Sequence, residues 1–385
     1  MTRFVANNQI TLLRNGEEYF PALLEAIASA RYEVHLQTFI FEADDTGLRV
    51  AAALQAAAQR GVSVHVLLDG YGSRKLTRTV LDGMRAEGIE VIFYRPQISP
   101  WTLQRNRLRR LHRKVSVIDG TTAFVGGINI IDDLNVPNGM PPRVDYALRL
   151  QGPLVKDIHT SCVRLWQRIS WANLQRTHSS RVPLALLDNP PLGQLRAAFV
   201  VRDNLLNRRA IERAYLKAIG NARDEILIAN AYFVPGRRFR RALVSAARRG
   251  VKVRLLLQGR MEYWLMLATH AFYRQFLREG IVIHEYHKSF MHSKVAVIDG
   301  RWATVGSSNI DPFSLLLARE ANVMVLDADF SQQLRSDIER SIRDGGQQVH
   351  ADDWERERWG KRVVSWLVFG MVRLILGMLG HSNKH

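Results

Sequence analysis

One polar motif occurs twice in this chain, and its side chains are of the types that carry out catalysis. Each copy reads His-x-Lys, four residues, Asp, six residues, and then Gly-Gly or Gly-Ser, any residue and Asn, without a gap over eighteen positions. A single copy could be a buried Val/Ile strand with incidental flanking charges, but two copies that keep the same polar positions argue against that explanation. The candidate catalytic residues are His112, Lys114 and Asp119 in the first copy and His292, Lys294 and Asp299 in the second, and the candidate substrate-binding amides are Asn129 and Asn309.

The motif suits attack on a phosphodiester. Histidine can act as a nucleophile, a general base or a general acid near neutral pH, and a lysine two residues along a strand projects to the same face. Two copies therefore offer two imidazoles and two ammonium groups. One neutral histidine would attack phosphorus and form a phosphohistidine, and the other would donate a proton to the leaving oxygen. The lysines and the Asn129 and Asn309 amides would stabilise charge on the non-bridging oxygens.

Metal binding is the competing use of paired histidines. The sequence contains no HxxxH pattern and no Cys/His cluster, and a lysine beside each histidine would repel a cation. We therefore expect phosphoryl transfer that uses neither a metal nor another cofactor.

The elements around the motif also repeat, in a β-α-β-α order. This alternation predicts an α/β fold with mostly parallel or mixed sheets and helices on both faces. A duplication of this size predicts two similar units, at residues 1–185 and 186–345, with a linker near Asp188 and a tail at 346–385. In the first unit we expect strands at 33–41, 62–68, 90–94, 114–118, 122–125 and 145–151 and helices at 50–60 and 77–87; in the second, strands at 225–231, 251–257, 282–286 and 320–326 and helices at 240–249 and 267–279.

A catalytic histidine also needs a partner that fixes its tautomer, as the aspartate of a hydrolase triad does. Asp145 in the first unit and Glu320 in the second are the best candidates, because each opens the strand that follows its motif. Asp119 and Asp299 lie in turns five residues beyond the lysines. We expect these two aspartates to hold the structure, through salt bridges, more than to touch the substrate.

Charge and cysteine content restrict the class of protein. The formal net charge of +18 favours a polyanionic partner, which is a nucleic acid, an anionic membrane or a phosphate-bearing substrate. Cys162 is the only cysteine, so no disulfide framework forms, as is usual in a reducing compartment. Its apolar helical context favours a packed core residue. Residues 1–15 are polar and mixed, and we expect neither a secretory signal nor a membrane anchor there.

Two insertions flank the first motif. Residues 95–111 contain several arginines and a tryptophan, and residues 135–142 lengthen a Pro/Asn/Gly loop. We expect both to form rims of the active-site mouth. The composition of 95–111 favours contact with an anion or a membrane, whereas 135–142 fits a solvated surface loop equally well.

Residues 361–380 form an apolar stretch in the tail. A spanning helix needs about 20 apolar residues, but Arg373 interrupts this stretch near its middle. At helical spacing the polar and small residues gather on one side and the bulky apolar residues on the other. This pattern favours an amphipathic helix in the plane of an anionic bilayer over a helix packed on the body of the protein or on a second subunit.

The doubled motif resembles that of the phospholipase D superfamily, and the likeness covers nearly the whole chain. Within that superfamily the chain is similar to the bacterial cardiolipin synthases, of the shorter branch that has no N-terminal transmembrane helices. The resemblance implies two pseudo-symmetric α/β/α sandwich units that share one interfacial active site, and a phosphatidyl-histidine intermediate. It also implies His112 as the nucleophile and His292 as the general acid and base, with Asp145 and Glu320 as the carboxylates that bind the histidines. The stretches that carry the likeness beyond the motif are 231–235, 291–294, 306–314 and 319–322.

The predicted function is the transfer of a phosphatidyl group from one phosphatidylglycerol to another, giving cardiolipin and glycerol. The expected partners are an anionic phospholipid substrate and a membrane surface, on the cytoplasmic side of a bacterial cell membrane, and no nucleic acid. The alternative is a phosphodiesterase or nuclease of the same superfamily, but a nuclease has no use for the apolar tail, and the sequence has no recognisable nucleic-acid-reading module. A third possibility, a degenerate lipid-binding protein, conflicts with the intact histidines and lysines.

Overall fold

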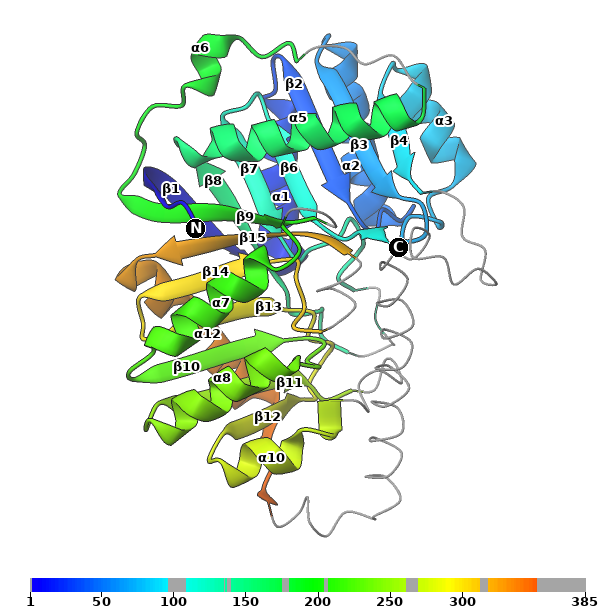
Figure 1. Cartoon of the computed structure of the whole chain (residues 1–385). Coiled ribbons are helices and arrows are strands. Elements are labelled where there is room, and N and C mark those ends of the chain that lie inside the picture. Colours follow the sequence, from blue (N-terminus) through cyan, green and yellow to red (C-terminus); the bar gives the residue numbers. More distant parts are fainter. Residues whose placement is uncertain are drawn as a thin grey trace, which may run out of the picture.

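One continuous mixed sheet of sixteen strands runs the length of the molecule (Figure 1). The strand order is β16-β12-β11-β10-β13-β14-β15-β9-β1-β8-β7-β6-β2-β3-β4, and β5 pairs with β15 beside this path. The α/β prediction is confirmed, but the sequence did not predict that both halves share one sheet. This computed structural model describes residues 2–95, 109–134, 136, 140–174, 180–203, 207–260, 269–311 and 318–351.

Each half of the sheet contains the same order of elements, except for β5 in the first half and β16 in the second. The first half contains β1 (Val5–Arg14), α1 (Asn15–Ala28), β2 (Glu33–Thr38), α2 (Asp45–Gln59), β3 (Ser63–Asp69), α3 (Arg78–Ala86), β4 (Glu90–Tyr94), β5 (Arg110–Leu111), β6 (Lys114–Ile118), β7 (Thr122–Gly126), β8 (Tyr146–Gln151) and α5 (Leu154–Ala172). The second half contains β9 (Leu195–Arg202), α7 (Ala210–Asn221), β10 (Glu225–Asn230), α8 (Arg237–Arg248), β11 (Lys252–Gln258), α10 (Tyr273–Arg278), β12 (Val282–Tyr286), β13 (Lys294–Ile298), β14 (Trp302–Gly306), β15 (Ala318–Leu326), α12 (Ala328–Gly345) and β16 (Gly346–Gln348). A short helix, α6 (Leu184–Leu187), lies on the connection between them.

Strand direction also repeats. In the first half, β2, β3 and β4 are parallel, and β2 pairs antiparallel with β6, the first strand of the antiparallel series β6-β7-β8. In the second half, β10, β11 and β12 are parallel, and β10 leads in the same way to β13, β14 and β15. The strands predicted at 114–118 and 122–125 are confirmed as the antiparallel pair β6-β7 around Asp119, and β13-β14 forms the equivalent pair around Asp299.

The two halves meet through β1 and β9, which pair antiparallel at the centre of the sheet. Asn8 is fully buried there. Its side-chain amide donates to the Leu195 carbonyl at 3.3 Å, and its oxygen accepts from the backbone N–H of Leu154 at 2.8 Å. Asn8 thereby ties the first strand of each half to the first turn of α5. The polar residues 1–15, which predicted no element, thus supply a central strand.

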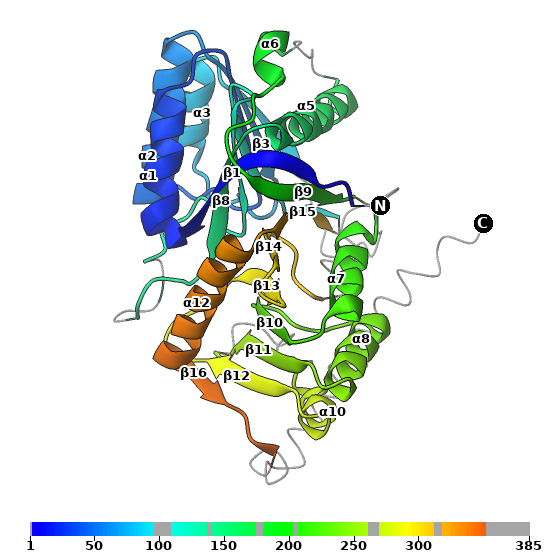
Figure 2. The ribbon, with the colours of Figure 1, turned by 90° about the vertical axis from the view of Figure 1, so that its left-hand side faces the viewer.

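Helices cover both faces of the sheet, and their layers exchange sides between the halves. Figure 2 shows α1, α2 and α3 on one side of the first half and α5 on the other, whereas α12 lies on the former side of the second half and α7, α8 and α10 on the latter. This arrangement is that of two similar units related by an approximate two-fold axis near β1 and β9. Buried side chains from both halves, including Leu148 and Leu227, join in one apolar cluster.

Several predicted boundaries were wrong for identifiable reasons. The strand expected at 33–41 ends at Thr38. The helix expected at 50–60 begins at Asp45, because the Asp44 side chain accepts from the Gly47 N–H and caps it. The helix expected at 267–279 is described only as the short α10.

Candidate active site

The first motif histidine is held by the second half of the molecule. The segment of β5 pairs in parallel with β15, and the backbone N–H of His112 then donates to the Arg319 carbonyl at 3.0 Å. The next residue, Glu320, places its carboxylate 2.9 Å and 3.1 Å from Nδ1 of His112. Backbone and side chain therefore fix the imidazole at two points.

The second motif repeats this contact in the opposite direction. The backbone N–H of His292 donates to the Val144 carbonyl at 2.8 Å, and Nδ1 of His292 lies 2.6 Å from Oδ2 of Asp145. The sequence had identified both carboxylates but had placed each in the unit of its own motif. The structure pairs each histidine with the carboxylate of the other half, because the segment before each histidine aligns with the strand start of the other unit.

These crossed contacts bring both motifs to one junction. The side chains of His112 and His292 are 16% and 21% exposed, so both rings reach solvent. Each Nδ1 faces a carboxylate, and such a contact selects the tautomer with the proton on Nδ1 and the lone pair on Nε2. The arrangement can therefore offer two Nε2 atoms to one ligand.

The motif lysines are buried beside their histidines. The Lys114 ammonium donates to the His112 carbonyl at 2.8 Å, and Lys294 donates to the carbonyl of His292. Lys294 also lies 3.8 Å from the Asp145 carboxylate. The Phe39 ring, which sequence reasoning missed, lies 4.9 Å from the His112 ring and 5.4 Å from the Lys114 ammonium.

Burial and positive charge keep the imidazoles neutral. Burial lowers the pKa of His112, and Lys114 and Lys294 lower it further against the opposing effect of Glu320. The pKa of His292 lies well below its ordinary value because of burial, Lys294, Lys114 and His112, in that order. Because Lys114 and His112 of the first motif lower the pKa of His292 in the second, the two motifs lie in one electrostatic environment.

Two further groups in this environment titrate near neutrality. Burial, followed by the charge of Lys294, lowers the pKa of Lys114 to about 7, although Glu320 opposes this effect. Burial also raises the pKa of Asp145 to about 6, against the effects of Lys294 and the Tyr146 N–H. The charges on Lys114 and Asp145 therefore change within about a unit of neutral pH.

The motif aspartates lie at the other end of their strands. Asp119 and Asp299 are separated from the lysines by a five-residue strand, which corresponds to about 16 Å. Each carboxylate accepts three backbone N–H groups, from residues 31–33 and 223–225 respectively. Their partners are thus backbone groups and not the cationic side chains that we expected. We therefore interpret the two aspartates as residues that hold the turn after each motif strand.

The motif asparagines differ between the halves. The Asn129 oxygen accepts from the Ile40 N–H at 3.2 Å. In the second half the contact runs in the opposite direction, because the oxygen of Asn230, at the end of β10, accepts from the N–H of Ile310, the residue after Asn309. The Asn309 oxygen is buried with no hydrogen-bond partner among the described residues. The two amides are near their histidines in sequence but are not bound in the same way.

The residue after the motif glycine also proves to be part of the site. A side chain at Gly127 would collide with Asp145, because its Cβ would lie 2.3 Å from Oδ1. At the equivalent position, the Ser307 hydroxyl donates to Glu320 and accepts from the Ala321 N–H. The Gly/Ser difference in the motif was visible in the sequence and could have suggested that each residue fits its own carboxylate.

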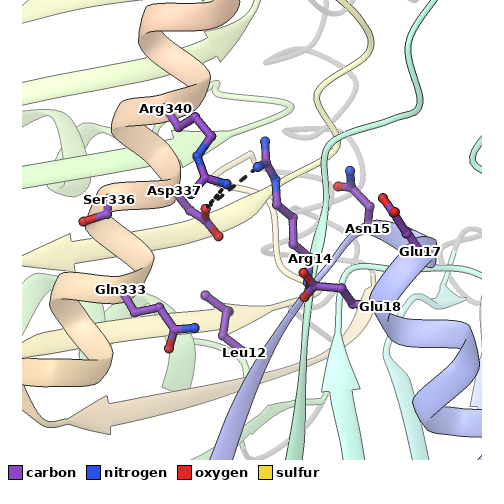
Figure 3. Close-up of a pocket in the computed structure, with 9 residues that line it drawn as sticks. All are labelled: Leu12, Arg14, Asn15, Glu17, Glu18, Gln333, Ser336, Asp337 and Arg340. Carbon is purple, nitrogen blue, oxygen red and sulfur yellow. Dashed lines mark hydrogen bonds and ion pairs between the residues drawn. The ribbon is translucent and has the colours of Figure 1, made fainter.

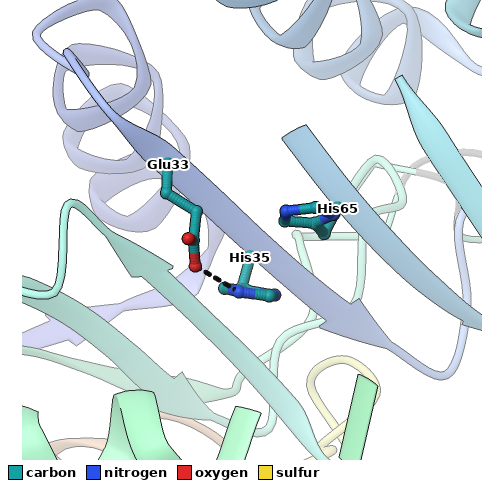
Figure 4. Close-up of side chains that lie close together, drawn as sticks. All are labelled: Glu33, His35 and His65. Atoms are coloured by element: carbon teal, nitrogen blue, oxygen red, sulfur yellow. Dashed lines mark ion pairs between the residues drawn. The ribbon is translucent and has the colours of Figure 1, made fainter. Parts of the chain in front are cut away.

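A second histidine cluster lies away from this junction, under α5. Figure 4 shows Glu33 and His35 on β2 and His65 on the neighbouring β3, and their potential ligand atoms lie within 4.8 Å of one another. The His35 and His65 rings are stacked, with centroids 4.7 Å apart and planes 23° from parallel. Nitrogen lone pairs lie in the ring planes, so stacked rings do not direct them at one point. The arrangement favours a buried hydrogen-bonded cluster over a metal centre.

Several predictions fall on parts of the chain that the structure does not describe. These are most of the insertion at 95–111, part of the loop at 135–142, and the tail at 361–380. Within the described residues, no helix has the length and apolarity needed to span a membrane.

Comparisons with known proteins show which family the chain resembles. A family profile described as "Cardiolipin synthase, PLD-like domain" matches residues 23–138 and 215–342. The chain is 39% identical to Cardiolipin synthase B of Escherichia coli K12, covering 98% of this chain and 91% of that protein. It is 30% identical to the Major cardiolipin synthase ClsA of Bacillus subtilis, covering 92% and 73% respectively. The crystal structure of phosphatidylserine synthase from Haemophilus influenzae has the same fold, with a TM-score of 0.72 over 98% of this chain and 96% of that one, at 14% identity.

Proposed function

The chain belongs to the cardiolipin synthase family of phospholipase D-like enzymes, and we propose that it transfers a phosphatidyl group between two phosphatidylglycerol molecules through a covalent intermediate on His112. The chain matches relatives named as cardiolipin synthases over almost its whole length. The observation that carries the mechanism is the crossed pairing of each motif histidine with a carboxylate from the other half.

His112 is the nucleophile. Glu320 holds its Nδ1, so the Nε2 lone pair is available for attack on the phosphorus of the first phosphatidylglycerol. A bond forms between Nε2 and phosphorus as the bond from phosphorus to the glycerol oxygen breaks. An imidazole attacks only in its unprotonated form, and burial together with the two lysines lowers the pKa of His112 and so favours that form.

His292 is the general acid and base. It donates the proton that glycerol takes as it leaves, and it then accepts the hydroxyl proton of the second phosphatidylglycerol. That hydroxyl attacks phosphorus, the bond to Nε2 of His112 breaks, and cardiolipin is released. In the free protein the pKa of His292 is low, but the negative charge of a bound phosphodiester raises the pKa of a nearby imidazole. Substrate binding would therefore supply the protonated form.

Lys114 and Lys294 stabilise the charge on the non-bridging oxygens. Both are buried and each is fixed by the carbonyl of its own histidine, so their positions are set before the substrate binds. Asn129 and Asn309 follow each strand pair at the same spacing, and we assign them to the edge of the same site. This chemistry needs no metal or cofactor.

The proposal also places the protein on the cytoplasmic face of a bacterial membrane as a peripheral protein. The net charge of +18 favours an anionic lipid surface, and the amphipathic pattern of the tail at 361–380 adds an apolar contact. Deletion of residues 363–385 should weaken sedimentation with phosphatidylglycerol vesicles. Unchanged sedimentation would assign the tail to packing within the protein.

The test of the reaction is the product that purified protein makes from phosphatidylglycerol vesicles, identified by mass spectrometry. His112→Ala and His292→Ala should each abolish cardiolipin formation, and the exposed His350→Ala should leave it unchanged. Brief incubation with lipid labelled at phosphorus should leave an acid-labile, alkali-stable label on the wild-type protein and none on His112→Ala. Cardiolipin formation by His112→Ala would refute the mechanism, and phosphatidic acid as the main product would indicate a phosphodiesterase.

A further inference from the structure

Two cavities lie at equivalent places in the two halves. One lies where α5 packs beside β9 and has a volume of about 360 Å³. The other lies where α12 packs beside β1 and has a volume of about 460 Å³. Each is therefore bounded by the last helix of one half and the first strand of the other. Their similar position makes the second cavity an internal control for the first.

In the cavity beside α12, the charges of the lining side chains balance one another. Arg14 and Arg340 face three carboxylates, and Figure 3 shows both guanidinium groups directed at Asp337. The distances to the Asp337 carboxylate are 3.8 Å from Arg14 and 3.1 Å from Arg340. The Glu18 carboxylate also accepts from the backbone N–H of Arg14, at 2.8 Å. No excess of positive charge remains to attract an anion.

The cavity beside α5, in contrast, has a large excess of positive charge. Its charged lining consists of two aspartates and five arginines, namely Asp157, Asp203, Arg113, Arg164, Arg168, Arg202 and Arg319. Arg164 and Arg168 are exposed, lie one turn apart on α5 and form no ion pair within the described part of the chain. They mark the outer edge of the cavity.

Two of the five arginines are buried deeper in the protein. Arg113 is 4% exposed and donates to the Gln37 side-chain oxygen at 2.8 Å and to the Ser161 hydroxyl at 3.0 Å, which are both neutral acceptors. Arg202 is 1% exposed and donates to the carbonyl of Arg208. Burial lowers the pKa of Arg113, and it lowers the pKa of Arg202 to about 10. The charges of Glu320, Asp311 and Asp203 oppose the effect of burial on Arg202. The Arg113 guanidinium, whose acceptors on Gln37 and Ser161 are neutral, gains from an anion nearby.

The cavity lies behind the active site and not within it. Arg113 follows His112 in the chain, yet its side chain contacts Ser161 on α5, whereas the His112 ring contacts Glu320. Arg319 precedes Glu320, and its Nε lies 3.4 Å from the Tyr94 hydroxyl. Successive side chains of an extended segment point to opposite sides, so these arginines face away from the reacting atoms. The connection to the site is the backbone, since the Arg319 carbonyl accepts from the N–H of His112.

We propose that the cavity beside α5 is a second anion site, which binds a phosphate group separately from the phosphodiester that reacts. Guanidinium groups match phosphate oxygens with paired N–H donors, and a volume of about 360 Å³ admits a phosphate or a glycerophosphate headgroup. The ligand is either free inorganic phosphate or the headgroup of an anionic phospholipid whose acyl chains remain outside. A bound anion would act on His112 and Glu320 through the Arg113 and Arg319 segments.

Equilibrium dialysis of the full chain tests this site without any turnover, so its outcome does not depend on the proposed reaction. The probes are labelled inorganic phosphate and glycerophosphoglycerol, the soluble headgroup of phosphatidylglycerol. The test variant is Arg164→Gln/Arg168→Gln, which changes exposed side chains only. The control is Arg340→Gln, which changes the corresponding arginine-bearing face of α12 in the other cavity.

The wild-type protein and Arg340→Gln should each bind an anion at this site. The double variant should bind that anion at least tenfold more weakly, so that at concentrations that fill the site in the wild type it binds one anion fewer per chain. Stronger binding of phosphate identifies a free-anion site, and stronger binding of glycerophosphoglycerol identifies a headgroup site. Equal stoichiometry and affinity in the wild type and the double variant would overturn the proposal. An equal loss in Arg340→Gln would also overturn it, because the effect would then come from net charge alone.

Discussion

The two halves of the sheet place the same carboxylate at the same point and bind it with different partners. Glu225 opens β10 and accepts from Arg254 and Arg335 at 2.7 Å each. Both guanidinium groups come from neighbouring elements, the adjacent parallel strand β11 and the helix α12. At the start of β10, the second half therefore has partly exposed ion pairs whose arginines stay charged at all relevant pH values.

The first half replaces the arginines by histidines. Glu33 opens β2, and its carboxylate contacts His35 on the same strand and lies 3.3 Å from Nε2 of His159 on α5. His65 on β3, the counterpart of Arg254, stacks on His35 and contacts Trp166 at 4.9 Å between ring centroids. The framework therefore tolerates a change of chemistry here, where only packing and charge balance are needed.

The catalytic junction shows the opposite behaviour. His112 and His292 keep the same type of partner, a carboxylate at Nδ1, although one is Glu320 and the other Asp145. The difference of one methylene is matched by the residue beneath, since Ser307 supports the longer side chain and Gly127 leaves space for the shorter one. Where the geometry of a reacting group is at stake, the halves diverge only in ways that compensate.

The largest effect should come from making the crossed carboxylates neutral. Glu320→Gln and Asp145→Asn keep the shape but can present an amide N–H to Nδ1, which favours the wrong histidine tautomer. We expect kcat to fall about 10²- to 10⁴-fold in each variant. Glu320→Gln should reduce the rate at which the protein is labelled at His112, because Glu320 orients the nucleophile. Asp145→Asn should in addition flatten the acid limb of the pH–rate profile, measured with soluble short-chain phosphatidylglycerol.

A matched control uses the motif aspartate. Asp119→Asn changes a carboxylate that binds three backbone N–H groups far from the histidines, so the folded protein should keep its kcat while its thermal stability falls. A loss of kcat in Asp119→Asn as large as that in Asp145→Asn would mean that Asp119 takes part in catalysis and does not only hold the turn.

The next largest effect should come from changing Gly127 and Ser307, the residues that lie against those carboxylates. Gly127→Ser would push its Cβ against Asp145 and displace the partner of His292, so we expect kcat to fall about 10²-fold. Ser307→Gly removes one hydrogen bond to Glu320 without a clash and should lower kcat by less than about tenfold. Steady-state kinetics on the two variants measure the contrast. Equal losses would mean that the Gly/Ser difference does not compensate for the Asp/Glu difference.

The sequence predicted the chemistry of the site better than its assembly. The two gapless copies of the motif point to the histidines and lysines, and the start of the strand after each motif points to the carboxylates, because side-chain type and spacing are local properties. The crossing was not predictable in the same way. It follows from the pairing of β5 with β15 and from the isolated bridge between Val144 and Met291. These are contacts between segments about 150 to 210 residues apart, and no local pattern encodes them.

Elements with mixed polarity were missed for a related reason. The strand β1 has the polar sequence VANNQITLLR and looks irregular alone, yet it lies between β8 and β9 with Asn8 fully buried. Its stability comes from strand partners on both sides and from the amide contacts of Asn8. Helix α5 was anticipated only as the apolar helical context of Cys162 and without bounds, because His159, Arg164 and Arg168 interrupt its apolar pattern; its buried face covers the first half of the sheet.

The smallest effect should come from neutralising Glu33 and Glu225, the carboxylates at the start of β2 and β10. Glu33 is 1% exposed, and Glu33→Gln would remove the charge that its histidine partners face in a buried place, at a cost of about 2 kcal/mol. Glu225 is 17% exposed at its side chain, so solvent screens its ion pairs and Glu225→Gln should cost about 1 kcal/mol. Urea unfolding of each variant against the wild type measures the two costs.

The pH dependence of these two costs follows from the carboxyl pKa values. Burial alone would raise the pKa of Glu33, but hydrogen bonds from His159 and His35 outweigh it and hold the pKa well below its usual range. The pKa of Glu225 is also lowered, by Arg335 and Arg254 against burial. A lowered carboxyl pKa stabilises the folded state above the ordinary value of 4.5, and this stabilisation is lost as the pH falls. Each Gln variant should therefore be less stable than wild type at pH 7, and this deficit should shrink as the pH falls below 4.5 toward the lowered pKa of the folded state. A deficit in Glu33→Gln that stayed constant down to about pH 3 would mean that packing of the histidine cluster, and not the charge of Glu33, sets the difference between the halves.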